Sequence, residues 1–211
     1  VIAASGTLGF ADTLEGLVDL SKVGAFITPS ITIAPRLGNP MPRTVEVTAG
    51  LVHATGLPNP GIEAFVSALL PRFATLPCPT IVSLCAESAE EWRVLAQAIG
   101  ERAEVLGLEL NLTPLSLYEK GFVQREVPTE VESLAHIHQS LNAVRSVTQK
   151  PLIAKLPCVG AEVGLMAKAA EEAGADMIAV SGAFPAVAVR LSGRELRLPY
   201  AVGGLSGPAI K

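Results

Sequence analysis

The sequence predicts an α/β protein whose centre is a parallel sheet. Short apolar runs alternate with segments whose apolar residues recur every three to four positions, which is the pattern of strands followed by helices. Of the 211 residues, 49% are hydrophobic and only 17% are charged, which suits strands buried on both faces of a sheet. A membrane-spanning helix is not predicted, because Pro, Gly or a charged residue interrupts every apolar run before the roughly 18 residues that such a helix requires.

In chain order, the runs expected to form strands are residues 1–5, 25–28, 80–84, 109–112, 152–156 and 177–181. Helices are expected between the later strands, because the apolar residues there fall on one helical face. The three faces consist of Trp92, Leu95, Ala96 and Ile99, of Leu134, Ile137, Leu141 and Val144, and of Val163, Met166, Ala170 and Ala173. Gly174 is expected to end the third helix in a left-handed conformation. Strands and helices at this spacing form βαβ units.

Two segments stand outside this alternation. Residues 29–61 hold six prolines, and an ordered connection of that length is usually a functional loop or a small hairpin. Because it follows a buried strand, where parallel α/β folds place ligand-binding loops, a binding loop is favoured over a surface embellishment. Residues 203–208 (GGLSGP) are expected to form a glycine-rich turn able to approach an anion closely. Six strands are fewer than the eight of a closed (β/α)8 barrel, so the residues alone leave open a doubly wound sheet or a barrel whose last quarter is absent.

Charge and cysteine content exclude several classes of protein. With 16 basic against 20 acidic residues the net charge is −4 and no basic tract occurs, so nucleic-acid binding is not expected. The cysteines, Cys78, Cys85 and Cys158, are too few for a disulfide framework or a cysteine-rich metal site. We expect buried, reduced thiols in a cytoplasmic protein that holds no metal.

Seven sequence stretches resemble the dihydroorotate dehydrogenase family, especially its class 1 catalytic subunits, in the same order and over essentially the whole chain. They are ASGTLGF (4–10), SIT (30–32), PRLGNPMPR (35–43), GLPNPG (56–61), ELNL (109–112), PLIAKL (151–156) and GGLSGPAIK (203–211). The resemblance implies a (β/α)8 TIM barrel that carries FMN at the carboxyl ends of its strands. On that likeness, residues 1–211 are expected to be a single FMN-binding barrel domain that lacks the family's first few residues and everything after the loop at Gly207. A polypeptide longer than this chain is therefore expected.

The same resemblance implies the contacts to FMN. Asn111 matches an amide that touches both flavin and substrate, and Lys155 matches a lysine beside the flavin N1–C2=O edge, where a cation stabilises the reduced ring. The apolar neighbours of Lys155 favour a buried lysine over a solvated one. The remaining matched positions are Ser5, Gly6 and Ser30 near the ring, and Gly204, Ser206 and Gly207 near the ribityl phosphate.

On the substrate side the chain departs from the family. Substrate contacts are implied at His53, Gly56, Leu57 and Asn111. The family's residues differ at Pro29 (Lys in the family), His53 (Asn), Ser83 (Asn), Pro114 (the catalytic Cys), and Gly182 with Ala183 (an Asn–Thr pair).

The change at Pro114 bears on catalysis. Oxidation of dihydroorotate removes a proton from C5 while a hydride leaves C6, so a base within hydrogen-bond reach is needed. The side chain of Pro114 carries no group that can accept a proton. The catalytic residue stays unassigned, with Ser116, Thr113 and His53 as candidates. The substitutions predict negligible turnover of dihydroorotate.

Two functions remain open at this point. The first is an FMN-dependent oxidoreductase acting on dihydroorotate or on another small unsaturated substrate. The second is a barrel subunit without redox turnover that binds flavin or a ligand and acts as a scaffold. The oxidoreductase ranks first, because Lys155, Asn111 and Ser5 are the polar residues that a reduced flavin needs. By resemblance, the partners are a small-molecule substrate, a second copy in a homodimer and an electron-transfer subunit, with no membrane.

Overall fold

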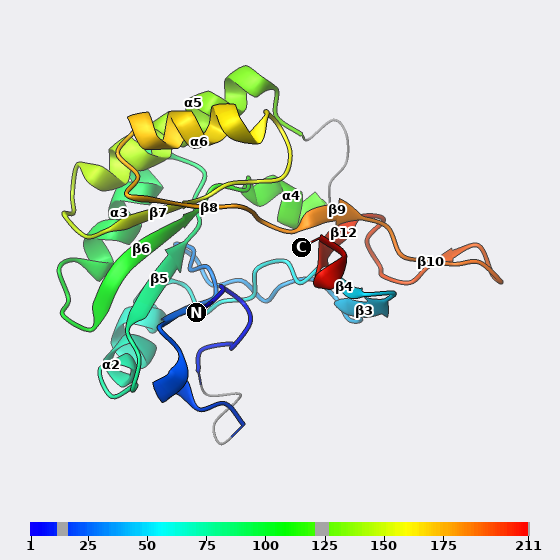
Figure 1. Ribbon diagram of the computed structural model, residues 1–211, viewed down its shortest axis with the longest axis horizontal. Helices are drawn as coiled ribbons and strands as arrows, with labels where there is room; N and C mark the ends of the chain where they lie inside the picture. Colours follow the sequence, from blue (N-terminus) through cyan, green and yellow to red (C-terminus); the bar gives the residue numbers. More distant parts are fainter. Residues whose placement is uncertain (12–16, 121–126, 211) are drawn as a thin grey trace.

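A computed structural model describes residues 1–11, 17–120 and 127–210. Its largest sheet is parallel, with six strands in the order β1–β2–β5–β6–β7–β8 (Figure 1). The strands are β1 (Ile2–Ala3), β2 (Ala25–Ile27), β5 (Thr80–Leu84), β6 (Val105–Asn111), β7 (Leu152–Lys155) and β8 (Met177–Ala179). The six strands follow one another across the sheet in the same order as along the chain. The order therefore never reverses as it does in a doubly wound sheet. The architecture is therefore an α/β half-barrel.

All six expected strands are present, five of them with shifted ends. β5 has the predicted bounds, β1 is shorter, and β6 starts four residues earlier than expected, at Val105. The early start was missed because Gly107 interrupts the apolar run. Its Cα faces the carbonyl oxygen of Pro151, which would lie 2.8 Å from a Cβ at this position. Gly107 therefore allows close approach of the neighbouring backbone.

The three longest helices cover the outer face of the sheet, and shorter helices and turns lie elsewhere in the chain (Figure 1). Their bounds are α1 (Ile62–Ala64), a π-helical turn η2 (Phe65–Leu69), α2 (Leu70–Phe73), α3 (Ala89–Ile99), α4 (Leu115–Lys120), α5 (Glu130–Arg145) and α6 (Val163–Glu172), with 3-10 turns η1 (Leu20–Lys22) and η4 (Pro208–Ile210). The three predicted helices are confirmed, and Gly174 has the expected positive φ of 91°. One residue of the predicted faces is misplaced. Val163, the first residue of α6, is 46% exposed.

The parallel sheet separates two layers of apolar side chains. The outer layer joins the sheet to α3, α5 and α6 and includes Trp92, Leu95 and Met166. The inner layer is small and consists of Ala25, Ile27, Ile81 and Ile153, with Ala179 packed against it. Since side chains two apart on a strand point to the same face, the residues that follow this inner layer toward the carboxyl ends also face inward.

A second, antiparallel sheet lies beyond the carboxyl ends of the parallel strands (Figure 1). Its strands are β3 (Thr44–Val47), β4 (Gly50–His53), β12 (Gly203–Ser206) and β9 (Phe184–Ala186), in that order, and β10 (Val189–Arg190) pairs with β11 (Glu195–Leu196) nearby. Val52, Ala188 and Leu198 form a separate core beneath it. The proline-rich segment 29–61 thus contains the hairpin β3–β4, which was one of its two expected forms.

The expectation of a glycine-rich turn at residues 203–208 is wrong for its first half. Residues 203–206 are strand β12, which pairs with both β4 and β9. Here the glycines allow close strand approach, since a Cβ at Gly203 would lie 2.7 Å from the carbonyl oxygen of His53. Only Gly207, with φ 117°, makes a turn.

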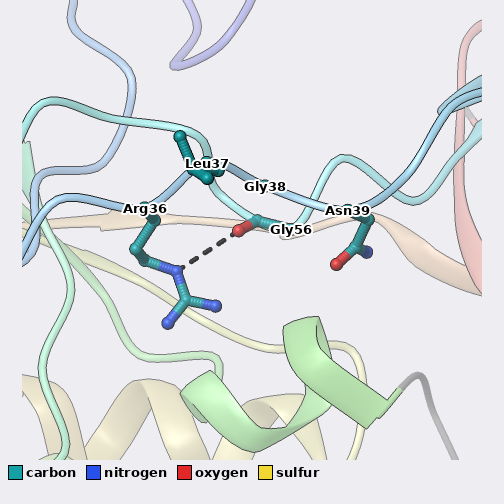
Figure 2. Close-up of a pocket in the computed structure, with 5 residues that line it drawn as sticks. All are labelled: Arg36, Leu37, Gly38, Asn39 and Gly56. Carbon is teal, nitrogen blue, oxygen red and sulfur yellow. Dashed lines mark hydrogen bonds between the residues drawn. The ribbon is translucent and has the colours of Figure 1, made fainter.

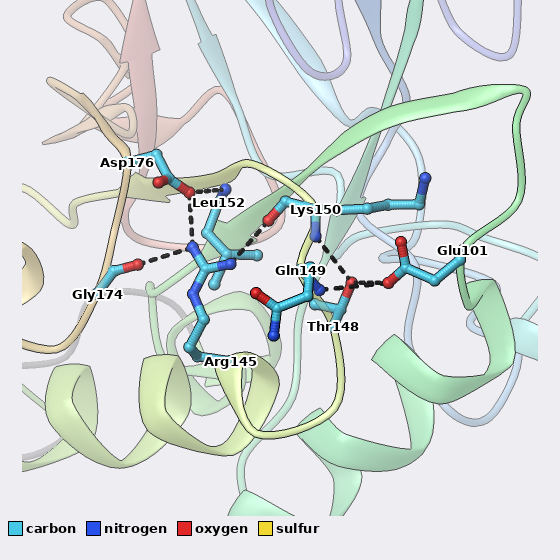
Figure 3. Close-up of polar contacts among 8 residues, drawn as sticks. All are labelled: Glu101, Arg145, Thr148, Gln149, Lys150, Leu152, Gly174 and Asp176. Carbon is cyan, nitrogen blue, oxygen red and sulfur yellow. Dashed lines mark hydrogen bonds and ion pairs between the residues drawn. The ribbon is translucent and has the colours of Figure 1, made fainter.

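Polar contacts at the amino end of the sheet tie helices to strands (Figure 3). Arg145, the last residue of α5, donates to the carbonyl oxygens of Lys150 and Gly174 and to the carboxylate of Asp176 at 2.6 Å. Asp176 also accepts from the backbone N–H of Leu152, the first residue of β7. These contacts stabilise the end of the sheet opposite to the carboxyl ends.

In the described part of the chain, no helix combines the length and apolar character needed to cross a bilayer. The three cysteines are free, and two of them, Cys78 and Cys85, are buried. Among these same residues, no group of three or more His, Cys, Asp or Glu side chains is placed to hold a metal ion.

Candidate functional site

Polar side chains form a layer directly above the inner apolar layer of the sheet. Ser83 on β5, Glu109 on β6 and Asn111 on β6 are 0%, 2% and 6% exposed. In the parallel register, Ser83 pairs with Glu109, and Asn111 pairs with Lys155 on β7. The fold thus brings residues from three neighbouring strands together at the carboxyl end of the sheet, where α/β barrels place their active sites.

A directed chain of hydrogen bonds runs through this layer. The Asn111 amide donates to Ser30 Oγ at 3.1 Å, and Ser30 and Ser83 hydroxyls are 3.0 Å apart. Ser83 Oγ donates to Glu109 Oε1 at 2.9 Å. Because a carboxylate only accepts, the Ser83 proton points to Glu109 and Ser30 donates to Ser83. Ser30, predicted on resemblance, and Asn111 are therefore joined directly.

Lys155 and Glu109 form a partly buried charge pair, with Lys155 Nζ 3.9 Å from Glu109 Oε1. Burial raises the pKa of the Glu109 carboxyl, while the Lys155 charge and the Ser83 hydroxyl act to lower it. The Lys155 side chain is 18% exposed, so it is partly buried, between the buried and the solvated lysine considered from the sequence.

Tyr118 on α4 closes the other end of the chain. Its hydroxyl accepts from the Asn111 amide at 3.0 Å and lies 3.3 Å from Asn111 Oδ1. Burial raises the pKa of Tyr118 to about 12, with hydrogen bonds from Asn111 and Thr113 opposing the shift. Tyr118 is therefore a neutral phenol at physiological pH and holds the amide of Asn111 in place.

His53 reaches this region from the second sheet. Its ring lies beside Gly204, where an added Cβ would be 3.1 Å from Cε1, 3.3 Å from Nε2 and 2.6 Å from the Cβ of Ala183. Burial lowers the pKa of His53, and the Lys155 charge lowers it further. The imidazole is therefore neutral near pH 7 and able to accept a proton.

The other base candidates are less suited to this role. Thr113 is buried beside Gly182, and Ser116 lies half-buried on α4; both carry unactivated hydroxyls. The Cys158 thiol, which follows β7, contacts Ser181 Oγ and the carbonyl oxygen of Gly182 at 2.9 and 2.8 Å. Burial raises the pKa of Cys158, which keeps the thiol protonated at neutral pH.

Comparisons with known proteins establish the family of the chain. The sequence model described as dihydroorotate dehydrogenase matches residues 1–211. The chain is 39% identical to dihydroorotate dehydrogenase B (NAD(+)), catalytic subunit, of Pelobacter propionicus, over 100% of this chain and 67% of that protein. Proteins of the same name from Geotalea uraniireducens and Maridesulfovibrio salexigens are 38% and 33% identical over 100% of this chain and 67% and 68% of their own lengths. This chain belongs to the dihydroorotate dehydrogenase family.

The remaining residues suggested by the dihydroorotate dehydrogenase resemblance are dispersed. Ser5 and Gly6 lie two and three residues beyond the carboxyl end of β1, and a Cβ on Gly6 would meet no atom within 4 Å. Gly204 and Ser206 belong to the second sheet, and Gly207 packs against Gly50 at the end of the β3–β4 hairpin. Direct contacts join Ser30, Asn111 and the Lys155–Glu109 pair into one group.

A pocket of about 290 Å³ lies in the proline-rich segment, lined by Arg36, Leu37, Gly38, Asn39 and Gly56 (Figure 2). Arg36 and Asn39 point to the same side of the loop. Arg36 Nε donates to the carbonyl oxygen of Gly56, and Asn39 donates to that of Tyr118. Gly56, an expected substrate contact, needs its φ of 73° here, and a Cβ would lie 2.4 Å from Asn39 Oδ1. Leu57, the next expected contact, has a φ of 54°.

Sequence reasoning missed Glu109 and Tyr118 as parts of this site. The signal for Glu109 was present, because it is the one charged residue within the apolar run 105–112. Tyr118 follows Asn111 by seven positions and carried no such signal.

Proposed function

We propose that this chain is the catalytic subunit of an FMN-dependent dihydroorotate dehydrogenase, which oxidises dihydroorotate to orotate in pyrimidine biosynthesis. The observation that carries the proposal is the group of partly buried Lys155 and buried Asn111 and Ser30 at the carboxyl end of a half-barrel. Gly182, Ala183 and Pro29 stand where the resemblance implies substrate-binding side chains, which favours a related small ring compound as the second candidate substrate.

The donor set fits a flavin ring. The ring presents carbonyl oxygens and nitrogens along one edge, and Asn111, Ser30 and Lys155 offer an amide, a hydroxyl and an ammonium group. When bound, FMN supplies the acceptor for the two electrons of the substrate. Lys155 would stabilise the negative charge of the reduced ring, and Asn111, held by Tyr118, would orient ring and substrate.

We propose His53 as the proton acceptor. Dihydroorotate loses a proton from C5 and a hydride from C6, and the neutral imidazole takes the proton. His53 combines a lowered pKa with a position beside Gly204 and within the field of Lys155. We propose this in place of the negligible turnover expected from Pro114, Pro29, Gly182 and Ala183: dihydroorotate turnover should occur, and it should depend on His53.

The assembly is also part of the proposal. The relatives are named catalytic subunits of an NAD(+)-linked enzyme, which supports an electron-transfer subunit that passes electrons from reduced FMN to NAD(+). We further propose that residues 1–211 belong to one FMN-binding domain of (β/α)8 type, and that the catalytic subunit forms a homodimer.

The test is reduction of bound FMN by dihydroorotate in the absence of oxygen, which is monitored as loss of flavin absorbance. In the His53→Asn variant, dihydroorotate should reduce bound FMN about 10²–10⁴-fold more slowly than in wild type, because an acid–base group is lost. FMN binding should change little. Pro114→Cys, which introduces the family's base, should restore reduction in the His53→Asn background. His138→Asn, on helix α5, is the matched control, and its bound FMN should be reduced at the wild-type rate. Wild-type protein that binds FMN but is not reduced by dihydroorotate would reject this substrate.

A further inference from the structure

Glu109 is a buried charged residue for which the proposed proton and hydride transfers have no use. It is 2% exposed on strand β6, between the fully buried Leu108 and Leu110. Transfer of a carboxylate from water to a protein interior is strongly unfavourable unless the charge is paired and hydrogen-bonded. A hydrophobic residue would satisfy the fold without that penalty, so the carboxylate is expected to serve the site.

Both neighbouring strands supply a partner to the same carboxylate oxygen. Ser83 Oγ on β5 donates to Glu109 Oε1 at 2.9 Å, and Lys155 Nζ on β7 lies 3.9 Å from that atom. Ser83 is itself held in place, because its backbone N–H donates to Thr28 Oγ1 at 3.1 Å and its hydroxyl contacts Ser30. The carboxylate is thereby fixed between two strands, with the lysine on one side.

This arrangement reduces the positive charge that Lys155 presents. A free lysine has a flexible four-carbon chain and a full charge, whereas here the ammonium group faces a carboxylate in a poorly solvated layer. Charges in such a layer interact more strongly than in water. The balance between the two groups therefore determines how strongly the site favours an anion placed beside Lys155.

We propose that Glu109 is a positioning residue that holds Lys155 against the inner face of the sheet and offsets its charge, and so sets the preference of the site for reduced over oxidised flavin. The inference rests on the proposed FMN site. It concerns the redox potential of the bound flavin, a property that does not depend on which substrate is oxidised.

The experiment measures the midpoint potential of bound FMN, and its dissociation constant, in variants of the full chain. Glu109→Gln keeps the shape of the side chain and removes its charge. It should favour reduced over oxidised FMN by about tenfold, a rise of about 30 mV for a two-electron couple. Lys155→Gln should lower the potential. Glu109→Asp keeps the negative charge and should have a potential closer to the wild-type value than Glu109→Gln. Asp176→Asn, in the ion pair with Arg145 at the other end of the sheet, is the matched control and should leave the potential unchanged.

The outcomes separate the two proposals. Wild-type protein that fails to bind FMN overturns the proposed function. Wild-type protein that binds FMN, with a Glu109→Gln variant that binds it equally well at an unchanged potential, overturns the role of Glu109 alone. If Glu109→Gln does not fold, Ser83→Ala takes its place, because loss of the Ser83 hydrogen bond favours the protonated carboxyl. A rise in the Ser83→Ala potential that is smaller than the about 30 mV expected for Glu109→Gln supports the proposal. An unchanged potential in Ser83→Ala overturns it.

Discussion

Asn111 is the residue on which most contacts of the site converge. Its amide donates to Ser30 and Tyr118, and its oxygen accepts from the backbone N–H of Thr113. An amide has no charge, so its orientation depends wholly on these partners. Residues that contact Asn111 should therefore affect both stability and the binding of any ring placed against it.

Tyr118→Phe should lower the free energy of unfolding by about 1 kcal/mol, because it removes one buried hydrogen bond and leaves the Asn111 amide short of a partner. Urea denaturation measures the change. Tyr200→Phe, in the half-buried region before β12, is the control and should unfold with the wild-type midpoint. A Tyr118→Phe protein as stable as wild type would show that the phenol hydroxyl does not hold Asn111.

His136 should make the protein less stable in mild acid. Burial lowers the pKa of His136 in the folded state, whereas the unfolded chain takes up this proton near pH ~6.5. Below that pH the unfolded state binds more protons, so the contribution of His136 to stability is lost as the pH falls from about 6.5 toward the lower folded pKa.

The measurement is urea unfolding at about pH 7 and about pH 5. His136→Gln should lose less stability than wild type over this interval. Ser140→Ala changes another buried polar atom of the same helix without a titrating group, and should keep the wild-type dependence on pH. Equal slopes for wild type and His136→Gln would contradict the prediction.

At the scale of elements, helix α5 depends on its first turn. Thr129 accepts from the backbone N–H of Glu132, and the Glu132 carboxylate accepts from the backbone N–H of Thr129. Thr129→Ala removes one half of this capping box and should lower the free energy of unfolding by about 1 kcal/mol. Thr129→Ser keeps the hydroxyl and should stay near wild type. Thermal unfolding compares the two, and an equal loss in both variants would assign the effect to the lost methyl group instead.

The elements that local pattern could predict are those of the parallel sheet and its helices. Trp92 and Leu141 follow the helical period, and the strands are apolar because both faces are covered. The second sheet could not be found in this way, since β4 pairs with β12 about 150 residues later, through glycines that show no strand pattern. Ser30 and Asn111 were found through resemblance, whereas Tyr118 enters the site only through tertiary contact.

At the scale of the whole molecule, several exposed apolar side chains lie close to one edge of the parallel sheet. Val180, Val187, Leu191 and Leu196, at and beyond the edge strand β8, are 69%, 53%, 88% and 49% exposed. An apolar strand edge is a template for association with other chains. The described chain should therefore associate at high concentration through this region.

Leu191→Lys should shift the distribution of species toward monomer, because it places a charge in the middle of the exposed group. Sedimentation velocity over a range of concentrations measures the shift. Val131→Lys, on the exposed face of α5 and 75% exposed in the wild type, is the control and should sediment as wild type. Identical behaviour of all three proteins would place the contacts elsewhere.

The two sheets have separate cores, and the proposed chemistry is divided between them. Lys155 and Asn111 stand on the parallel strands, whereas His53 and Gly204 stand on the antiparallel sheet above its own core. Substitutions in the small sheet should therefore leave the packing of the parallel sheet intact. On the proposed function, that separation would give a lineage a route to new substrates that does not pass through an unstable ancestor.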